Sequence, residues 1–224
     1  MRIQVLMGGT FNPIHYGHLR IADGVRAALG LNELALLPTA TPPHKPLERM
    51  TSAAHRVEMV RLSLEEFPAL TICPLELTDS TAFTIDTLRQ LRHGPPVVDP
   101  VFVVGMDTLS ELPTWHKYRE LLDEFDLISI ERPGYDGAEA QGYDPFVKER
   151  LQPLVTANQA RRLVNDKRLG RGGRIFPLSL SAEAISSREI RRRTAAGEAL
   201  GDLVPKDVAL YIQRHDLYAR GVQP

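Results

Sequence analysis

The stretch from residue 7 to residue 18, Met-Gly-Gly-Thr-Phe-Asn-Pro-Ile-His-Tyr-Gly-His, constrains the fold of this chain most. Before it, residues 2–6 form a short apolar run with β-branched residues, which predicts a buried strand. After it, apolar residues recur at helical spacing over residues 19–29, and Gly30 stands where a helix C-cap glycine belongs. The chain therefore begins with a strand, a glycine turn and the N-terminus of a helix.

This arrangement predicts an anion site. Gly8 and Gly9 let the backbone approach a ligand closely, and the N–H groups and positive dipole end of the helix point to the same place. His15 and His18 are three residues apart, so we expect them to share a face of the first helical turn. They fit a phosphate ligand. Two other readings are surface histidines and a metal pair, but no third ligand stands nearby at matched spacing, so we expect no protein metal site.

Strands alternate with helices along the rest of the chain, which predicts an α/β fold with a Rossmann-like, mostly parallel sheet flanked by helices. Residues 1–224 are expected to form a single domain, with a variable insertion at about 134–173 and a mobile, basic, glycine-rich loop at 167–174. The expected strands are 33–38, 70–77, 101–104, 127–130 and 174–178, and the expected helices are 51–67, 84–91, 117–125, 145–164, 187–196 and 205–211.

Composition excludes several classes of protein. The net charge of −1 gives no general attraction to nucleic acid or to an anionic membrane, so neither is expected as a partner. No apolar run approaches the roughly 20 residues that span a bilayer, and no signal peptide precedes the first strand, which favours a cytoplasmic protein. Cys73 is the only cysteine, which excludes an intramolecular disulfide; we expect it to be a buried apolar residue.

Residues 8–13, Gly-Gly-Thr-Phe-Asn-Pro, followed by His15-x-Gly17-His18, resemble the signature of the nucleotidylyltransferase superfamily, which shares its H-x-G-H feature with class I aminoacyl-tRNA synthetases. Within it, the chain is most similar to the bacterial nicotinate mononucleotide adenylyltransferase family. The resemblance implies the HIGH-type nucleotidylyltransferase fold with C-terminal helices. Asn12 replaces the usual Asp, which removes a charge but keeps a capping side chain.

A second signature lies near the other end of the chain. Residues 185–191, Ile-Ser-Ser-Arg-Glu-Ile-Arg, resemble the family's I-S-S-T-x-I-R motif, with Arg188 in place of Thr. The plainer reading is a helix N-cap at Ser186 or Ser187. Only Arg191 has the motif position, and we expect Arg192 and Arg193 to be solvated. The resemblance implies that ATP contacts Gly8, Gly9, Thr10, Phe11, His15, His18, Gly105, Ser186, Ser187 and Arg191.

The remaining clusters resemble the family's acceptor site. The segment Gly105-x-Asp107, with Trp115 eight residues after the aspartate, is similar to the one that holds nicotinate mononucleotide, the indole stacking on the pyridine ring. Thr84 resembles the residue that receives the nicotinate carboxylate. Lys45 and Arg132 complete the implied substrate contacts. The alternatives are that Asp107 caps a turn, Trp115 packs in the core and Lys45 is a solvated loop residue.

The implied reaction is adenylyl transfer from ATP to nicotinate mononucleotide, giving deamido-NAD and pyrophosphate. Mg²⁺ would bridge the phosphates, and His15, His18 and Arg191 would be catalytic. The alternatives are another adenylyl or cytidylyl transferase, such as phosphopantetheine adenylyltransferase, and a non-catalytic nucleotide sensor. The sequence leaves the oligomeric state open, a homo-oligomer included.

Overall fold

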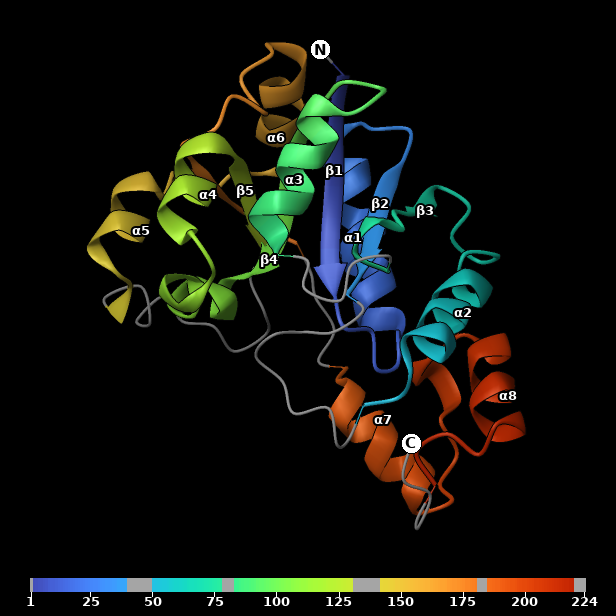
Figure 1. The fold of residues 1–224 in the computed structure, drawn as a ribbon. Coiled ribbons are helices and arrows are strands. Elements are labelled where there is room, and N and C mark those ends of the chain that lie inside the picture. Colours follow the sequence, from blue (N-terminus) through green and yellow to red (C-terminus); the bar gives the residue numbers. More distant parts are fainter. Residues whose placement is uncertain (1, 40–49, 78–82, 131–141, 181–184, 220–224) are drawn as a thin grey trace.

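The computed structural model describes residues 2–39, 50–77, 83–130, 142–180 and 185–219. Within these ranges the strands form one parallel sheet in the order β3-β2-β1-β4-β5-β6 (Figure 1). The α/β, Rossmann-like fold class is therefore confirmed. The strands are β1 (Arg2–Gly9), β2 (Leu34–Pro38), β3 (Leu70–Ile72), β4 (Val98–Gly105), β5 (Asp126–Ile130) and β6 (Ile175–Leu178).

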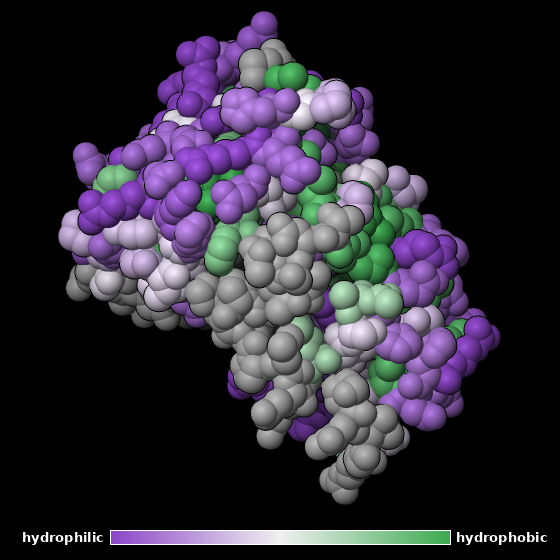
Figure 2. Space-filling model, in the orientation of Figure 1, coloured by the Kyte–Doolittle hydropathy of each residue, from purple (hydrophilic) through white to green (hydrophobic). Residues whose placement is uncertain are grey.

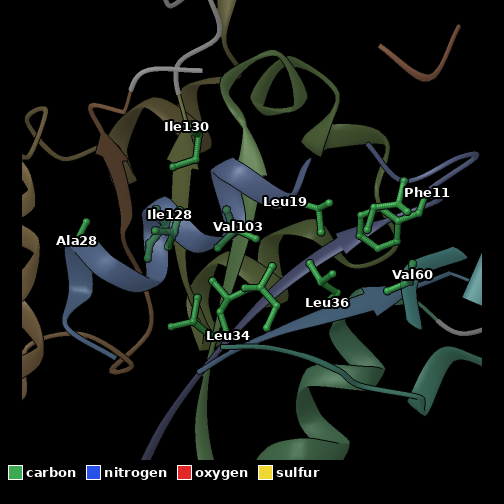
Figure 3. Packing of buried hydrophobic residues seen from close by; sticks show 14 of the residues in the cluster. Phe11, Leu19, Ala28, Leu34, Leu36, Val60, Val103, Ile128 and Ile130 are labelled. Carbon is green, nitrogen blue, oxygen red and sulfur yellow. The ribbon is translucent and has the colours of Figure 1, made fainter. Parts of the chain in front are cut away.

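Alternate residues of the central strands bury side chains on opposite faces of the sheet, as the pleat requires. Val5 and Val103 enter a cluster with residues of α1, α2, α6, α7 and α8, whereas Leu6 and Phe102 enter a cluster with residues of α3, α4 and α5. Figure 3 shows the first cluster, in which Phe11 from the loop after β1 packs with side chains of strands and helices. The described helices are α1 (Tyr16–Leu29), α2 (Ala53–Ser63), α3 (Thr84–His93), α4 (Tyr118–Glu124), α5 (Pro145–Arg150), α6 (Ala157–Asn165), α7 (Ser187–Ala195) and α8 (Lys206–Arg214).

The order of the strands reverses direction between β1 and β4. The chain moves outward from β1 to β2 and β3, then returns to β4 on the other side of β1. In open parallel sheets, ligands bind beyond the carboxyl ends of the strands at such a switch point. In Figure 1 the head of β1 points toward α7, on the side where α2 and α8 also lie. The site is expected in this region.

Two expected elements differ from the structure. The strand expected over 70–77 ends at Ile72, and residues 75–77 form a short helical turn, although Cys73 is buried as expected. The single helix expected over 145–164 is broken into α5 and α6. Between them the chain follows the edge of β6, where the N–H groups of Gln152 and Val155 donate to the carbonyls of Ile175 and Pro177. Pairing with a sheet edge outweighs local helical periodicity here.

The basic segment 167–174, expected to be mobile, is instead tied to the sheet. The Asp126 carboxylate, which is fully buried, accepts hydrogen bonds from the N–H groups of Gly170 and Arg171 at 2.8 and 3.1 Å. Arg174 forms an ion pair with the same carboxylate at 3.0 Å. A buried carboxylate is stable only when its oxygens are paired in this way.

The surface in the orientation of Figure 1 is mostly hydrophilic. Hydrophobic residues gather to the right of its centre, over the side of the sheet that carries β2 and β3 (Figure 2). No described helix is both long and apolar enough to cross a bilayer.

Candidate active site

The glycine loop after β1 is shaped by two phenylalanine rings. A Cβ on Gly8 would lie 2.4 Å from Cζ of Phe102, and one on Gly9 would lie 2.6 Å from Cε1 of Phe11. Both distances are below 3.0 Å, so a larger residue at either position would force the buried phenylalanine ring beside it to move. From the sequence, these glycines are expected because a ligand must approach the backbone closely. The structure adds a second reason, which is the packing of two aromatic rings against them.

The two histidines stack on each other at the start of α1. Their ring centroids are 3.7 Å apart with 23° between the planes, and the Phe11 ring meets His18 edge-on at 5.2 Å. His15 is the N-cap and lies just outside the helix, rather than in its first turn; its Nδ1 accepts from the backbone N–H of His18 at 3.3 Å. This hydrogen bond assigns the proton of the neutral His15 ring to Nε2, which is then a donor.

Arg56, on α2, joins the glycine loop to the segment after β2 and to the segment before α2. Its guanidinium is fully buried and donates to the carbonyls of Thr10, Thr39 and Thr51 at 2.7, 2.6 and 3.0 Å. Burial lowers the pKa of Arg56. The sequence reasoning missed this residue, although Met59 and Val60, three and four positions later, place it on the buried face of the helix.

The second signature meets the first. Ser187, the first residue of α7, donates from its hydroxyl to the Pro13 carbonyl at 2.9 Å, and Arg191 donates to the Asn12 carbonyl at 2.6 Å. Ser186 is the N-cap of α7 and accepts from the N–H of Glu189. Two segments more than 170 residues apart in sequence therefore form one structure.

The other arginines of α7 are engaged with carboxylates. Glu189 pairs with Arg192 and Arg193, and Arg192 also pairs with Glu198. Hydrogen bonds from Arg192 and Arg193 lower the pKa of Glu189 to about 2. Both arginines keep more than a third of their side-chain surface exposed, so of these neighbours only Arg191 is shown bonded to the loop.

The acceptor cluster adjoins the glycine loop through Phe102. Trp115 is half-buried, and its ring meets the Phe102 ring edge-on at 6.3 Å. The same Phe102 ring lies against Gly8. Asp107 is exposed on the turn that follows Gly105 at the end of β4. Trp115 is therefore neither locked in the interior nor remote from the loop.

Thr84 is joined to this cluster by the residues next to it. It is the first residue of α3, and the preceding Phe83 stacks on His116 with centroids 4.2 Å apart. His116 follows Trp115 directly, so the N-terminus of α3 lies beside the indole segment. Lys45 and Arg132 lie outside the described residues.

A buried carboxylate that the sequence reasoning missed lies below the first turn of α3. Glu76 is 4% exposed, and its Oε1 accepts from the Thr87 hydroxyl at 3.2 Å. Burial raises the pKa of Glu76, although hydrogen bonds from the side chains of Thr39 and Thr87 partly oppose this. Glu76 thus joins α3 to Thr39, the residue that follows β2 and whose N–H donates to the Gly9 carbonyl.

Comparisons with known proteins agree with this geometry. The family model described as cytidylyltransferase-like matches residues 6–193. The chain is 38% identical to the "Probable nicotinate-nucleotide adenylyltransferase" of Symbiobacterium thermophilum, over 98% of this chain and 96% of that one. It is also 38% identical to the protein of the same name from Aeromonas hydrophila, over 95% of each chain. Among solved structures, the nicotinic acid mononucleotide adenylyltransferase of Plasmodium falciparum complexed with NaAD has a similar fold, with a TM-score of 0.73 and 18% identity over 97% of this chain and 98% of that one.

Proposed function

This chain belongs to the nicotinate-nucleotide adenylyltransferases of the cytidylyltransferase-like family, and we propose how its residues serve that family's reaction. The reaction is adenylyl transfer from ATP to nicotinate mononucleotide, which gives deamido-NAD and pyrophosphate and belongs to NAD biosynthesis. The attacking phosphate oxygen is already an anion, so the reaction needs no protein nucleophile. The protein has to align two anions and neutralise the charge that develops between them.

The donor half of the site is the glycine loop with its stacked histidines. His15 has its Nε2–H available as a donor, and the His18 ring stacks on it with the centroids 3.7 Å apart. Both imidazoles can therefore donate to phosphate oxygens of ATP. Arg191 adds a positive charge that its hydrogen bond to Asn12 fixes beside the loop. Gly8, Gly9, Thr10, Phe11, Gly105, Ser186 and Ser187 form the remaining surface that the nucleotide contacts.

The acceptor half is the segment around Trp115. An indole that is half-exposed presents a face on which a pyridine ring can stack. Thr84 and the N-terminus of α3 offer N–H donors to the nicotinate carboxylate. Asp107 is exposed at the end of β4, where it can orient the mononucleotide. Lys45 and Arg132 complete the proposed contacts.

The metal enters as part of the substrate, as the Mg²⁺ complex of ATP. The described residues contain no group of three or more metal-ligating His, Cys, Asp or Glu side chains. This fits Mg²⁺, which keeps several waters and is held mainly by substrate phosphates. The ion neutralises phosphate charge, and the residues of the chain orient the nucleotide that carries it.

The single observation that carries this proposal is the stacked pair of histidines braced by residues 187 and 191. The test is His18→Ala, assayed by pyrophosphate release from ATP, Mg²⁺ and nicotinate mononucleotide. We expect turnover to fall by at least about 100-fold, because a donor aimed at developing charge is lost, while the melting temperature stays near that of the wild type. His93→Ala, at the exposed end of α3, is the matched control and should keep full activity.

The same assay separates the alternatives. Pyrophosphate release with phosphopantetheine or from CTP, but not with nicotinate mononucleotide, would indicate another transferase of the superfamily. ATP binding without any release would indicate a nucleotide sensor. Wild-type turnover in His18→Ala would remove this histidine from the mechanism.

A further inference from the structure

Tyr218, in the segment after α8, reaches back to the glycine loop. Its hydroxyl donates to the side-chain oxygen of Asn12 at 2.7 Å, although the two residues are 206 positions apart. The same oxygen accepts from the N–H of Thr51 at 3.4 Å. Tyr218 lies outside the 6–193 range that the family model matches.

Asn12 is held through both its backbone and its side chain. Its carbonyl accepts from Arg191 and its side chain from Tyr218, while the carbonyl of the next residue, Pro13, accepts from Ser187. His15 follows two positions after Pro13. The direction in which the loop presents the histidine pair therefore depends on how Asn12 is held.

The surroundings keep the Tyr218 hydroxyl in its neutral, donating form. Burial raises the pKa of Tyr218 to about 12, although Thr51, Arg191 and Arg56 act in the opposite direction. The phenol thus lies among the same groups that brace the loop. It donates a hydrogen bond there at any physiological pH.

The backbone that carries this phenol is strained. Asp216 and Tyr218 have φ values of 49° and 65°, in the left-handed region that non-glycine residues rarely occupy. Such a conformation is unfavourable for residues other than glycine and persists where surrounding contacts impose it. The ring of Tyr218 packs against the hydrophobic cluster that contains Phe11, and its hydroxyl bonds the side chain of Asn12, which points to a role in the site.

We infer that Tyr218 is a positioning residue for ATP: its hydroxyl fixes Asn12 and so sets where the glycine loop and the histidine pair meet the triphosphate. The inference rests on the proposed function. It extends the donor site to the C-terminal segment, 206 residues from the loop that it supports. Tyr218 acts through Asn12 and does not touch the reacting atoms.

The test is Tyr218→Phe, which removes one oxygen and keeps the ring. The loss of one hydrogen bond in the loop should raise KM for ATP about tenfold and leave KM for nicotinate mononucleotide within twofold. The matched control is Tyr211→Phe, because the Tyr211 hydroxyl bonds the ring of His55 at 2.9 Å and no residue of the loop. This variant should keep both KM values.

Several outcomes would overturn the inference: an unchanged KM for ATP in Tyr218→Phe, an equal rise in both KM values, or the same rise in Tyr211→Phe. A second measurement uses Asn12→Ala. In that background Tyr218→Phe should add less than a twofold change, because the acceptor is already gone; a further tenfold change would show that Tyr218 acts elsewhere. If the wild type releases no pyrophosphate, the proposed function fails by itself, and calorimetric Kd values for ATP on the same variants decide the role of Tyr218.

Discussion

Gly17→Ala should separate the stability of this protein from its activity. Gly17 lies in the first turn of α1, between the two histidines. A Cβ built there would lie 3.0 Å from Nδ1 and 3.1 Å from Cε1 of His15. Ordinary contacts begin at 3.4 Å, so the His15 ring would have to retreat by about 0.4 Å, the difference between 3.4 and 3.0 Å.

The ring has little room for this movement. His15 is 4% exposed and stacked on His18, and its Nδ1 already accepts from the His18 N–H at the long distance of 3.3 Å. The displacement would break this hydrogen bond and turn Nε2 away from the phosphates. A misplacement of 1 Å costs about 100-fold in rate, so 0.4 Å should cost on the order of tenfold in kcat. The helix, by contrast, gains up to about 1 kcal/mol from alanine.

The assay combines pyrophosphate release with urea unfolding. Gly24→Ala is the control, because it lies in the same helix and, among the described residues, its Cβ would meet only Leu180, at an ordinary 3.4 Å. We expect both variants to unfold at an equal or higher urea concentration than the wild type, and only Gly17→Ala to lose turnover. Full turnover in Gly17→Ala, or an equal loss in Gly24→Ala, would refute the reasoning.

Two further predictions concern buried carboxylates. The raised pKa of Glu76 means that the folded state favours the protonated acid, so its contribution to stability is fully present below pH 4.5, its unfolded value, and is lost as pH rises through the folded pKa. Glu76→Gln should therefore gain stability over the wild type as pH rises above 4.5, measured by urea unfolding at several pH values; a constant difference would contradict this. Asp126→Asn should lose about 3 kcal/mol of unfolding free energy at pH 7, because the charge of Arg174 loses its partner. A loss below about 1 kcal/mol would show that the segment 167–174 does not depend on this ion pair.

The parts of the site that are contiguous in sequence could be predicted. Glycines, a helix start and histidines three residues apart all fall within residues 7–18, and local rules place them on one turn. The alternation of strands and helices likewise predicted the parallel sheet, which is confirmed. The structure brings the described candidates together at one end of that sheet, while their individual roles remain proposals.

The parts that depend on distant partners could not be predicted. The helical spacing of Met59 and Val60 indicates that Arg56 is buried, but it does not reveal that the carbonyls of Thr10 and Thr39 accept from its guanidinium. The break between α5 and α6 depends on the open edge of β6, which local periodicity does not contain. The sequence places Phe102 only within the apolar strand expected over 101–104. In the structure its ring contacts both Gly8 and Trp115. Tertiary packing decided each of these features.

The braces on the glycine loop also set the order in which the molecule can mature. The carbonyl of Pro13 can accept its hydrogen bond only after residue 187 has been synthesised. The carbonyl of Asn12 likewise needs residue 191, and its side chain needs residue 218. On the ribosome, a nascent chain displays the entire nucleotide motif while nearly all of these supports are still unmade. A product of translation interrupted before residue 187 would carry the first signature intact and yet lack all three of these hydrogen bonds to the glycine loop.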